Sequence, residues 1–432
     1  MTLKILLVNP AIYDFTAYDF WLKPYGLLSV AGYLRGKADF KLFDHLDRAY
    51  PLGSNQKSQQ SDDWGRGRFQ DEIIQPPDIL LDIPRHFRRF GRPRLCFEEF
   101  LKENEPSDYV FIQTMMTYWY PAVAEVIEDV RKYWPKSKIV LGGNYVTLCP
   151  EHAEKLCADF VLKGTNLNPL WDYLKVEVGG QKAALWELYD KLDVGVLKLS
   201  QGCPFNCTYC SVPQVYKEFK VRSIECCLEE VELLYSKGVS NIAFYDDALL
   251  FRSDEVLVPF LNEVLKKNIK VNFHCPNALN ARFITKALAA LMVRSGFKTF
   301  YLGFECISRD FQKQTGSKVY SEELVEAVKH LTAAGAKHSN ITAYHLLGHP
   351  DCDVQQIEDS MNFSSSLGIR GMLADFSPIP GTIDGQKGSK WVDMDEPLFH
   401  NKTAFTIIRL GNDESNRLKD LQRYLNHQIP KD

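Results

Sequence analysis

Apolar residues in the first 165 positions fall in short runs that alternate with stretches of helical spacing. The run at residues 3–9 is nearly continuous, as expected of a strand that is covered on both faces of a sheet. Further strands are predicted at 40–44, 109–114, 138–141 and 159–162, and helices at 27–35, 121–133 and 151–157. This alternation predicts a parallel sheet with helical crossovers, which binds ligands at the carboxyl ends of its strands.

A second series of strands and helices runs from about residue 194 to residue 382. Its strands are predicted at 194–199, 242–245, 270–274, 299–304, 340–347 and 372–376, and its helices at 225–236, 255–267, 286–294, 322–333 and 354–366. Six such units are too few for a closed eight-stranded barrel, so the pattern predicts a partial, open barrel with its site at the strands' carboxyl ends. The predicted domains are therefore 1–175, 190–382 and a C-terminal extension at 383–432 with weak periodicity.

Residues 48–105 interrupt the first series with a polar stretch that becomes basic at 84–94. A connection of this length is usually a functional loop or a partly disordered insertion. Its basic run could contact a phosphorylated substrate or nucleic acid, or it could form a solvated face or a lid paired with acidic neighbours. The slightly acidic chain, with 51 basic and 55 acidic residues, favours the second interpretation.

Composition excludes several classes of protein. Hydrophobic residues make up 45% of the 432 positions and charged residues 25%, which is the balance of an ordinary globular protein. The net charge of −4 gives no reason to expect a nucleic-acid partner. No apolar run reaches the roughly 18 residues of a membrane span, and the N-terminus has no secretory signal, so we expect a cytoplasmic protein.

The eleven cysteines include one tight group, Cys203, Cys207 and Cys210. Without an export signal, such a group indicates metal or redox chemistry rather than disulfides. Thiolates suit iron–sulfur clusters or zinc, and three thiolates on a four-iron cluster would leave one iron open to another ligand. The alternative is a zinc site with a fourth ligand from Cys226 or Cys227, although their predicted helix suits packing residues better. Three unrelated buried thiols do not suit a loop that carries Gly, Pro and Asn.

The C-x3-C-x2-C spacing, with Tyr209 before its last cysteine, follows the first strand of the six-unit series and resembles the signature of the radical S-adenosylmethionine (SAM) superfamily. The resemblance extends over about 190 residues. It implies SAM contacts for residues at or after the strand ends, namely Asp246 and Asp247 with the amino group, Glu305 with the ribose and Gly348 near the adenine, while residues 377–382 resemble the closing loop. The acidic pair could instead cap the next helix or lie solvated in the loop.

Two further positions leave alternatives open. Asn277 and Arg282 follow the third strand of this series and could line the site or serve turn geometry after Pro276. Arg222 could pair with the SAM carboxylate or remain a surface charge.

The same resemblance implies the chemistry. The three cysteines would hold a [4Fe–4S] cluster, and SAM would chelate its open iron through the amino and carboxylate groups. One electron would then cleave SAM into methionine and a 5′-deoxyadenosyl radical, which abstracts hydrogen from a substrate at the barrel mouth. The implied electron donor is a flavodoxin or ferredoxin.

The first half resembles the cobalamin-binding domain that precedes many radical SAM barrels. The matching stretches are 6–10, 25–28, 141–147 and 150–152, and they imply cofactor contacts for Asn9, Thr114, Gly142 and Gly143. The Asp-x-His-x-x-Gly motif of the lower ligand is absent, since Asp44 and His45 are adjacent. The resemblance therefore implies cobalamin held without a protein histidine, or a domain that kept the fold and lost the cofactor. The apolar, aromatic stretch 114–121 could pack against a flat corrin or belong to the core.

The predicted fold is thus α/β, with a Rossmann-like (flavodoxin-like) parallel sheet followed by a partial (β/α)6 radical SAM barrel and a short tail. The predicted function is that of a cobalamin-dependent radical SAM methyltransferase acting on an unactivated carbon or phosphorus centre of a small molecule or peptide. The alternatives are radical chemistry without methyl transfer, such as rearrangement, cyclisation or C–C bond formation, and a binding protein with a zinc or iron–sulfur site that shapes a loop.

Overall fold

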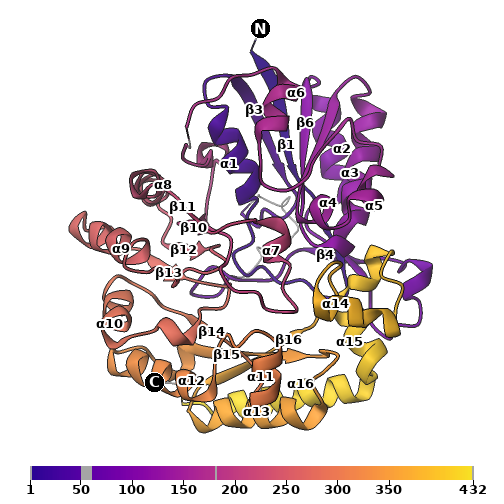
Figure 1. Ribbon diagram of the computed structural model, residues 1–432. Helices are drawn as coiled ribbons and strands as arrows, with labels where there is room; N and C mark the ends of the chain where they lie inside the picture. Colours follow the sequence, from indigo (N-terminus) through magenta and orange to yellow (C-terminus); the bar gives the residue numbers. More distant parts are fainter. Residues whose placement is uncertain (1, 50–60, 181, 431–432) are drawn as a thin grey trace. The chain divides into compact units, whose positions relative to one another are not determined.

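The computed structural model describes residues 2–49, 61–180 and 182–430, and the chain divides into two compact units (Figure 1). Unit 1 comprises Met1–Gly195, Ser236–Gly238 and Asp395–Asn401. Unit 2 comprises Val196–Tyr235, Val239–Met394 and Lys402–Asp432. Each unit is built on its own parallel strands.

Unit 1 contains a five-stranded sheet in the order β3-β1-β6-β7-β8, and every neighbouring pair is parallel. Its strands are β1 (Leu3–Asn9), β3 (Ala38–Asp44), β6 (Tyr109–Thr114), β7 (Lys138–Gly143) and β8 (Phe160–Leu162). The predicted strands lie within or overlap these ranges. The last five residues of β1 are all buried, which confirms the sequence-based expectation of a strand covered on both faces.

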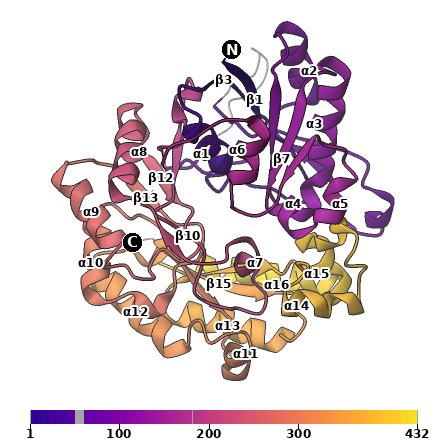
Figure 2. The same ribbon diagram turned by 45° about the horizontal axis from the view of Figure 1, so that its top comes forward.

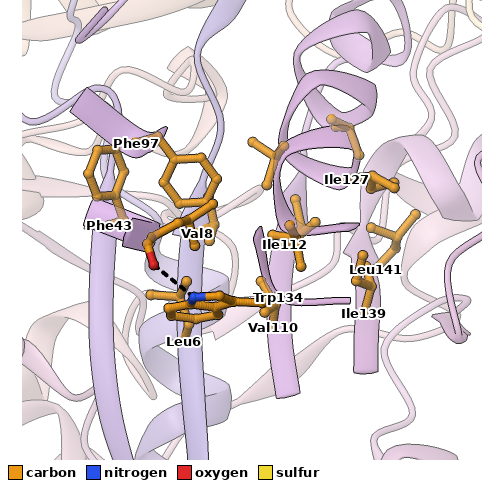
Figure 3. Packing of buried hydrophobic residues seen from close by; sticks show 14 of the residues in the cluster. Leu6, Val8, Phe43, Phe97, Val110, Ile112, Ile127, Trp134, Ile139 and Leu141 are labelled. Atoms are coloured by element: carbon orange, nitrogen blue, oxygen red, sulfur yellow. Dashed lines mark hydrogen bonds between the residues drawn. The ribbon is translucent and has the colours of Figure 1, made fainter. Parts of the chain in front are cut away.

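Alternate residues of β1 point into two separate hydrophobic clusters. Leu6 and Val8 pack with residues of α2 (Arg94–Glu103) and α3 (Tyr120–Tyr133), and Trp134 at the end of α3 donates to the Leu101 carbonyl at 2.9 Å (Figure 3). Ile5 and Leu7 pack with α1 (Tyr25–Tyr33) and α6 (Asn168–Leu174) on the opposite face (Figure 2). The period of two along the strand therefore divides the core into two layers.

Two short helices follow strand β7 in the chain. Helices α4 (Asn144–Leu148) and α5 (Pro150–Glu154) follow β7, so the predicted helix at 151–157 is shorter than expected. Cys157 has a φ of 56°, a left-handed backbone angle that a continuous right-handed helix does not contain.

The insertion predicted as a loop is largely ordered, which corrects that expectation. Strands β2 (Ile12–Asp14), β5 (Arg88–Phe90) and β4 (Asp71–Ile73) form an antiparallel sheet, and the 3-10 turn Asp78–Leu80 lies between β4 and β5. Its basic run is paired with acids, because Arg89 bonds Glu125 at 2.7 Å and Arg94 bonds Asp129 at 2.6 Å. Residues 50–60, also part of the predicted insertion, lie outside the described residues.

The barrel strands form two three-stranded runs, β13-β12-β9 and β14-β15-β16. The strands are β9 (Val194–Leu197), β12 (Asn241–Phe244), β13 (Asn272–His274), β14 (Phe300–Glu305), β15 (Ile341–Leu347) and β16 (Arg370–Asp375). Parallel bridges at Phe273–Phe297 and Leu279–Leu302 connect the two runs. This arrangement confirms the predicted partial barrel.

Helices alternate with these strands and lie around them in the ribbon view (Figure 2). They are α8 (Ile224–Ser236), α9 (Leu257–Lys266), α10 (Lys286–Arg294), α12 (Ser321–Ala333) and α13 (Val354–Ser366). Two of the predicted ranges, 286–294 and 354–366, match the observed helices at both ends.

The C-terminal tail is more regular than its weak periodicity predicts. It forms α14 (Ile383–Lys387), α15 (Lys402–Leu410) and α16 (Asn412–His427). Helix α16 covers the edge strand β16 through polar groups, since Gln422 accepts from Leu373 N at 2.9 Å and Asn426 bonds both N and O of Gly371. These side-chain amides satisfy backbone groups of an edge strand, a contact that a search for apolar spacing overlooks.

Trp134 offers a test of the unit 1 core. Its side chain is 2% exposed, so Trp134→Ala should lower the free energy of unfolding by about 3–5 kcal/mol, and Trp134→Phe, which loses mainly the hydrogen bond, by about 1–2 kcal/mol. Urea denaturation of both variants measures the difference. The exposed Tyr424→Ala serves as a control and should shift stability by less than about 0.5 kcal/mol. Wild-type stability of Trp134→Ala would contradict this packing.

Candidate iron–sulfur and cofactor site

The three clustered cysteines lie in a loop whose two stems are paired. Strands β10 (Ser200–Gln201) and β11 (Lys220–Val221) form an antiparallel ladder, with Ser200 opposite Val221. At the start of the loop Gly202 has a φ of 80°, and a Cβ there would lie 2.6 Å from the Glu218 carbonyl oxygen. Only glycine suits that turn, so the backbone reaches Cys203 along a defined path.

The three thiols share one electrostatic environment. Burial raises the pKa of Cys203 and Cys207, and it raises that of Cys210 to about 12. The charge on Cys207 raises the pKa of both other thiols, whereas the Lys318 ammonium lowers all three pKa values. Burial favours the protonated form of these thiols. A bound metal would favour the thiolate form instead, because the thiolate is the form that binds a metal.

The donor set itself suits more than one metal group. Three cysteine thiols in one loop can serve an iron–sulfur cluster or a zinc ion. Three thiolates on a four-iron cluster leave one iron open to another ligand. Among the described residues, no three or more His, Cys, Asp or Glu side chains are grouped so that they could hold a metal ion as they stand.

Cys226 and Cys227, the alternative source of a zinc ligand, are packing residues with other partners. The Cys226 sulfur accepts from Arg222 at 3.4 Å, and the Cys227 thiol donates to the Lys198 carbonyl at 3.7 Å. Arg222 is partly buried and bonds Glu230 at 2.5 Å and the Lys198 carbonyl at 2.7 Å, so it is not a solvated surface charge.

Asp246 braces the strand that leads into the cysteine loop. It lies two residues after the end of β12 and is 1% exposed. Its carboxylate accepts from Ser200 N and Ser200 Oγ at 2.6 Å and from Leu199 N at 3.1 Å. Burial raises the pKa of Asp246 to about 6, against the lowering effect of these donors. The carboxylate does not cap the next helix, one of the alternatives for this residue.

Asp247 and Asn277 lie beside Asp246. Asp247 accepts from Gly202 N at 3.0 Å and from Lys198 Nζ at 3.3 Å, and Lys198 also bonds the Tyr216 hydroxyl at 3.0 Å. The exposed Asn277 donates to the Asp246 carbonyl at 3.1 Å. Arg282, in contrast, pairs with Glu323 at 2.8 Å. The structure thus gathers Asp246, Asp247 and Asn277 at the carboxyl ends of neighbouring strands.

Glu305 occupies a strained position at the end of β14. Its φ is 68°, and the pairing of β14 with β15 shifts register between Gly303 and Glu305. Its Oε1 lies 3.3 Å from Lys318 Nζ, and a Cβ on Gly303 would lie 2.7 Å from the same nitrogen. Left-handed geometry in a residue other than glycine is costly and is often found at functional sites.

Lys318 is a residue that the sequence analysis missed. It follows Gly316 and Ser317, which have φ values of 111° and 52°, and this turn directs its ammonium to Glu305 and the thiols. The Gly-Ser pair between the predicted strand at 299–304 and the predicted helix at 322–333 was the available signal. Gly348, a predicted site residue, has a φ of 82° and packs closely on Thr406, whose Oγ1 would be 2.7 Å from a Cβ.

In unit 1, Asn9, Thr114, Gly142 and Gly143 lie at the carboxyl ends of three adjacent strands, β1, β6 and β7. Thr114 Oγ1 donates to the Gly142 carbonyl at 3.1 Å. Asn9 donates to Asp44 at 2.7 Å, and Tyr189 donates to the other oxygen of Asp44 at 2.5 Å.

Two nearby features belong mainly to the core. His45 is 1% exposed and packs against the rings of Phe43 and Phe97, so it is unsuited to bind a ligand at the sheet edge. In the 114–121 stretch Tyr118 is 2% exposed and the Trp119 indole donates to Asp14 at 3.0 Å, whereas Met116 is 43% exposed. Met116 is thus exposed, and Met115, Trp119, Tyr120 and Pro121 are half-buried.

Residues 197–363 match the model of the Radical SAM superfamily. The chain carries a radical SAM domain. Enzymes of this superfamily use a [4Fe–4S] cluster and SAM, in agreement with the thiol-bearing loop of unit 2.

Two curated relatives are methyl-transferring proteins by name. An uncharacterised methyltransferase of Pyrococcus horikoshii is 26% identical over 196 residues, which are 45% of this chain and 41% of that protein. The hopanoid C-3 methylase of Methylococcus capsulatus is 21% identical over 216 residues, 50% of this chain and 40% of that protein. The chain therefore spans about two fifths of the length of these relatives.

Solved structures share the fold of this radical SAM protein. The methyltransferase TsrM of Kitasatospora setae, with cobalamin and a [4Fe–4S] cluster bound, gives a TM-score of 0.64 at 14% identity and covers 90% of this chain and 78% of that one. OxsB, with aqua-cobalamin and SAM bound, gives 0.59 at 13% identity and covers 98% and 61%. At this identity the likeness establishes the architecture. No helix among the described residues is long and apolar enough to cross a membrane.

The two adjacent glycines of β7 make a matched pair of variants. Gly143 has a φ of 126°, and a Cβ there would lie 2.0 Å from the Thr114 carbonyl oxygen, whereas a Cβ on Gly142 would meet Leu162 at an ordinary 3.8 Å. We expect Gly143→Ala to lower the free energy of unfolding by at least about 2 kcal/mol, and Gly142→Ala to leave it unchanged or raise it by about 0.5 kcal/mol. Chemical denaturation measures both, and equal effects would contradict this description of the edge.

Proposed function

We propose that this chain is a radical SAM enzyme that binds a [4Fe–4S] cluster through Cys203, Cys207 and Cys210. The observation that carries the proposal is the position of these three thiols in one loop, which follows the first strand of a partial barrel and is closed by the β10–β11 pairing. When bound and reduced, the cluster supplies the electron that cleaves SAM into methionine and a 5′-deoxyadenosyl radical.

The charged residues around the loop match the functional groups of SAM. We assign Asp247 and Asn277 to the amino group, with Asp246 as the brace beneath them, because the oxygens of Asp246 already accept three close donors from the chain. Lys318 suits the SAM carboxylate, and Glu305 suits the ribose hydroxyls. Tyr209 and Gly348 complete the adenosine side of the proposed site.

We propose further that unit 1 binds cobalamin and that the reaction is methyl transfer to an unactivated carbon or phosphorus centre. Cobalamin, when bound, supplies a carrier for the methyl group. The support is the shared fold with TsrM and OxsB, whose structures contain cobalamin, together with Gly142, Gly143 and Thr114 at the strand ends. The buried position of His45 agrees with a corrin held without a histidine from this domain.

The substrate in this proposal is a small molecule or a peptide, and the reductant is a flavodoxin or ferredoxin in the cytoplasm. Ion pairs occupy Arg88, Arg89 and Arg94 of the basic insertion, which supports the expectation that no nucleic acid is needed as a partner.

Anaerobic reconstitution tests the cluster. The wild type should take up about four irons per chain and convert SAM to 5′-deoxyadenosine when a reductant is added. Alanine at Cys203, Cys207 or Cys210 should reduce that conversion to background, because each thiol holds part of the cluster. Cys157→Ala, a change at an exposed cysteine of unit 1, is the matched control and should retain full conversion. A colourless protein that binds one zinc ion would overturn the proposal.

Cobalamin binding tests methyl transfer. Wild-type protein mixed anaerobically with hydroxocobalamin and passed through a desalting column should retain about one equivalent, read from the visible absorption of the corrin. Gly142→Trp should lose most of it, because a large side chain would cover the strand ends, whereas Ile73→Trp on the exposed face of β4 should not. If the wild type cleaves SAM but retains no cobalamin, radical chemistry without methyl transfer replaces this part of the proposal.

A further inference from the structure

Thr208 and Tyr209, the two residues between Cys207 and Cys210, are held by groups from distant parts of unit 2. Thr208 uses all its polar groups. Its N–H donates to the Thr315 carbonyl at 3.4 Å, its carbonyl accepts from Asp384 N at 3.1 Å, and its hydroxyl donates to the Asp384 carboxylate. Both the backbone N–H and the side chain of Asp384 therefore form hydrogen bonds with Thr208 in the cysteine loop.

Asp384 is a buried carboxylate with several donors. It is 1% exposed, and its Oδ1 accepts from Lys387 Nζ at 2.7 Å, while Lys387 also pairs with Asp351. Burial acts to raise the pKa of Asp384, but the neighbouring His349, Lys387 and Thr208 hold that pKa well below its ordinary value. The carboxylate is thus ionised, and its hydrogen bonds are of the strong, charge-assisted kind.

His349 connects this carboxylate to the loop after β15. It is completely buried, its Nδ1 accepts from Asp351 N at 3.1 Å, and its Nε2 lies 3.0 Å from Asp384 Oδ2. The His349 ring meets Tyr209 edge to face, with centroids 6.3 Å apart.

We propose that Asp384 is a positioning residue which, with His349, sets the separation of Cys207 and Cys210 by clamping Thr208 and Tyr209 between them. The inference rests on the proposed cluster and adds a role for residues that neither the cysteine motif nor the SAM contacts include. Asp384 lies in α14, just after the closing loop at 377–382, and His349 lies next to Gly348. The clamp therefore joins the cysteine loop to the two segments that follow β15 and β16.

The consequence is a loop shape that exists before the cofactors bind. A flexible loop would have to be ordered by the cluster itself, at an entropic cost for every residue that becomes fixed. In a clamped loop the entropic cost of ordering these residues is met during folding. The clamp also resists the movement that would release an iron. Loss of the clamp should therefore increase the rate at which iron leaves and should alter the cluster that remains.

Thr208→Val, which keeps the side-chain volume, and Thr208→Ser, which keeps the hydroxyl and loses a methyl group, test the clamp. Valine removes the hydroxyl donor and leaves Asp384 without that partner, so iron should leave the reconstituted protein for a chelator about tenfold faster. The EPR spectrum of the reduced cluster with SAM should also broaden or shift. Serine keeps the hydroxyl and should restore both the rate, within about twofold, and the spectrum. Asp384→Ala should resemble Thr208→Val.

Ser364→Ala is the matched control, because it removes another side-chain hydroxyl hydrogen bond of unit 2, the one between Ser364 and His345 at 3.0 Å. It should leave the EPR spectrum and the iron-release rate unchanged even if it lowers the melting temperature. Unchanged release and spectrum in Thr208→Val, with a wild type that holds its cluster, would overturn the clamp alone. A wild type that assembles no cluster would overturn the proposed function and the clamp together.

Discussion

The structure of unit 2 depends on carboxylates that hold one loop by its backbone. Asp246 and Asp247 accept N–H groups of Leu199, Ser200 and Gly202 before the first cysteine. Bonds between an ionised carboxylate and buried N–H groups are stronger than neutral ones, and they leave no backbone group unpaired. These bonds hold the backbone before the first cysteine without help from the thiols.

Each acid that lines the site lies close to an ammonium group. This pairing lowers the free-energy cost of keeping a half-buried carboxylate ionised. Asp247 has Lys198 at 3.3 Å, and Glu305 has Lys318 at 3.3 Å. An isolated buried charge would cost several kcal/mol, whereas a pair of opposite charges avoids most of that penalty. A zwitterionic ligand such as the amino-acid part of SAM brings both charges at once. It can exchange partners with the two pairs without leaving an unbalanced charge behind.

Much of this arrangement was predictable from local sequence, and the rest depends on contacts between distant segments. The alternation of strands and helices and the cysteine spacing are local, so they predicted the sheet, the partial barrel and the three thiols. Lys318 and Asp384 reach the site through a left-handed turn after α11 (Arg309–Gln314) and through a helix in the tail, and neither leaves a periodic signal. Helix α16 was missed although Leu418, Leu421 and Leu425 have helical spacing and pack in a hydrophobic cluster, while Gln422 and Asn426 attach the helix to β16 by amide hydrogen bonds.

The strand ends of unit 1 differ from the cysteine site, because they present backbone and small residues in place of charges. Asn9, whose side chain could have served a ligand, is bonded to Asp44, and Asp44 is bonded in turn to Tyr189. What remains at the neighbouring strand ends is the half-buried Gly142 and the exposed Gly143, next to Thr114. A large flat ligand needs such a surface, because every side chain beyond Cα would hold it away from the sheet. The cobalamin proposal therefore rests on what these strand ends lack as much as on the fold that carries them.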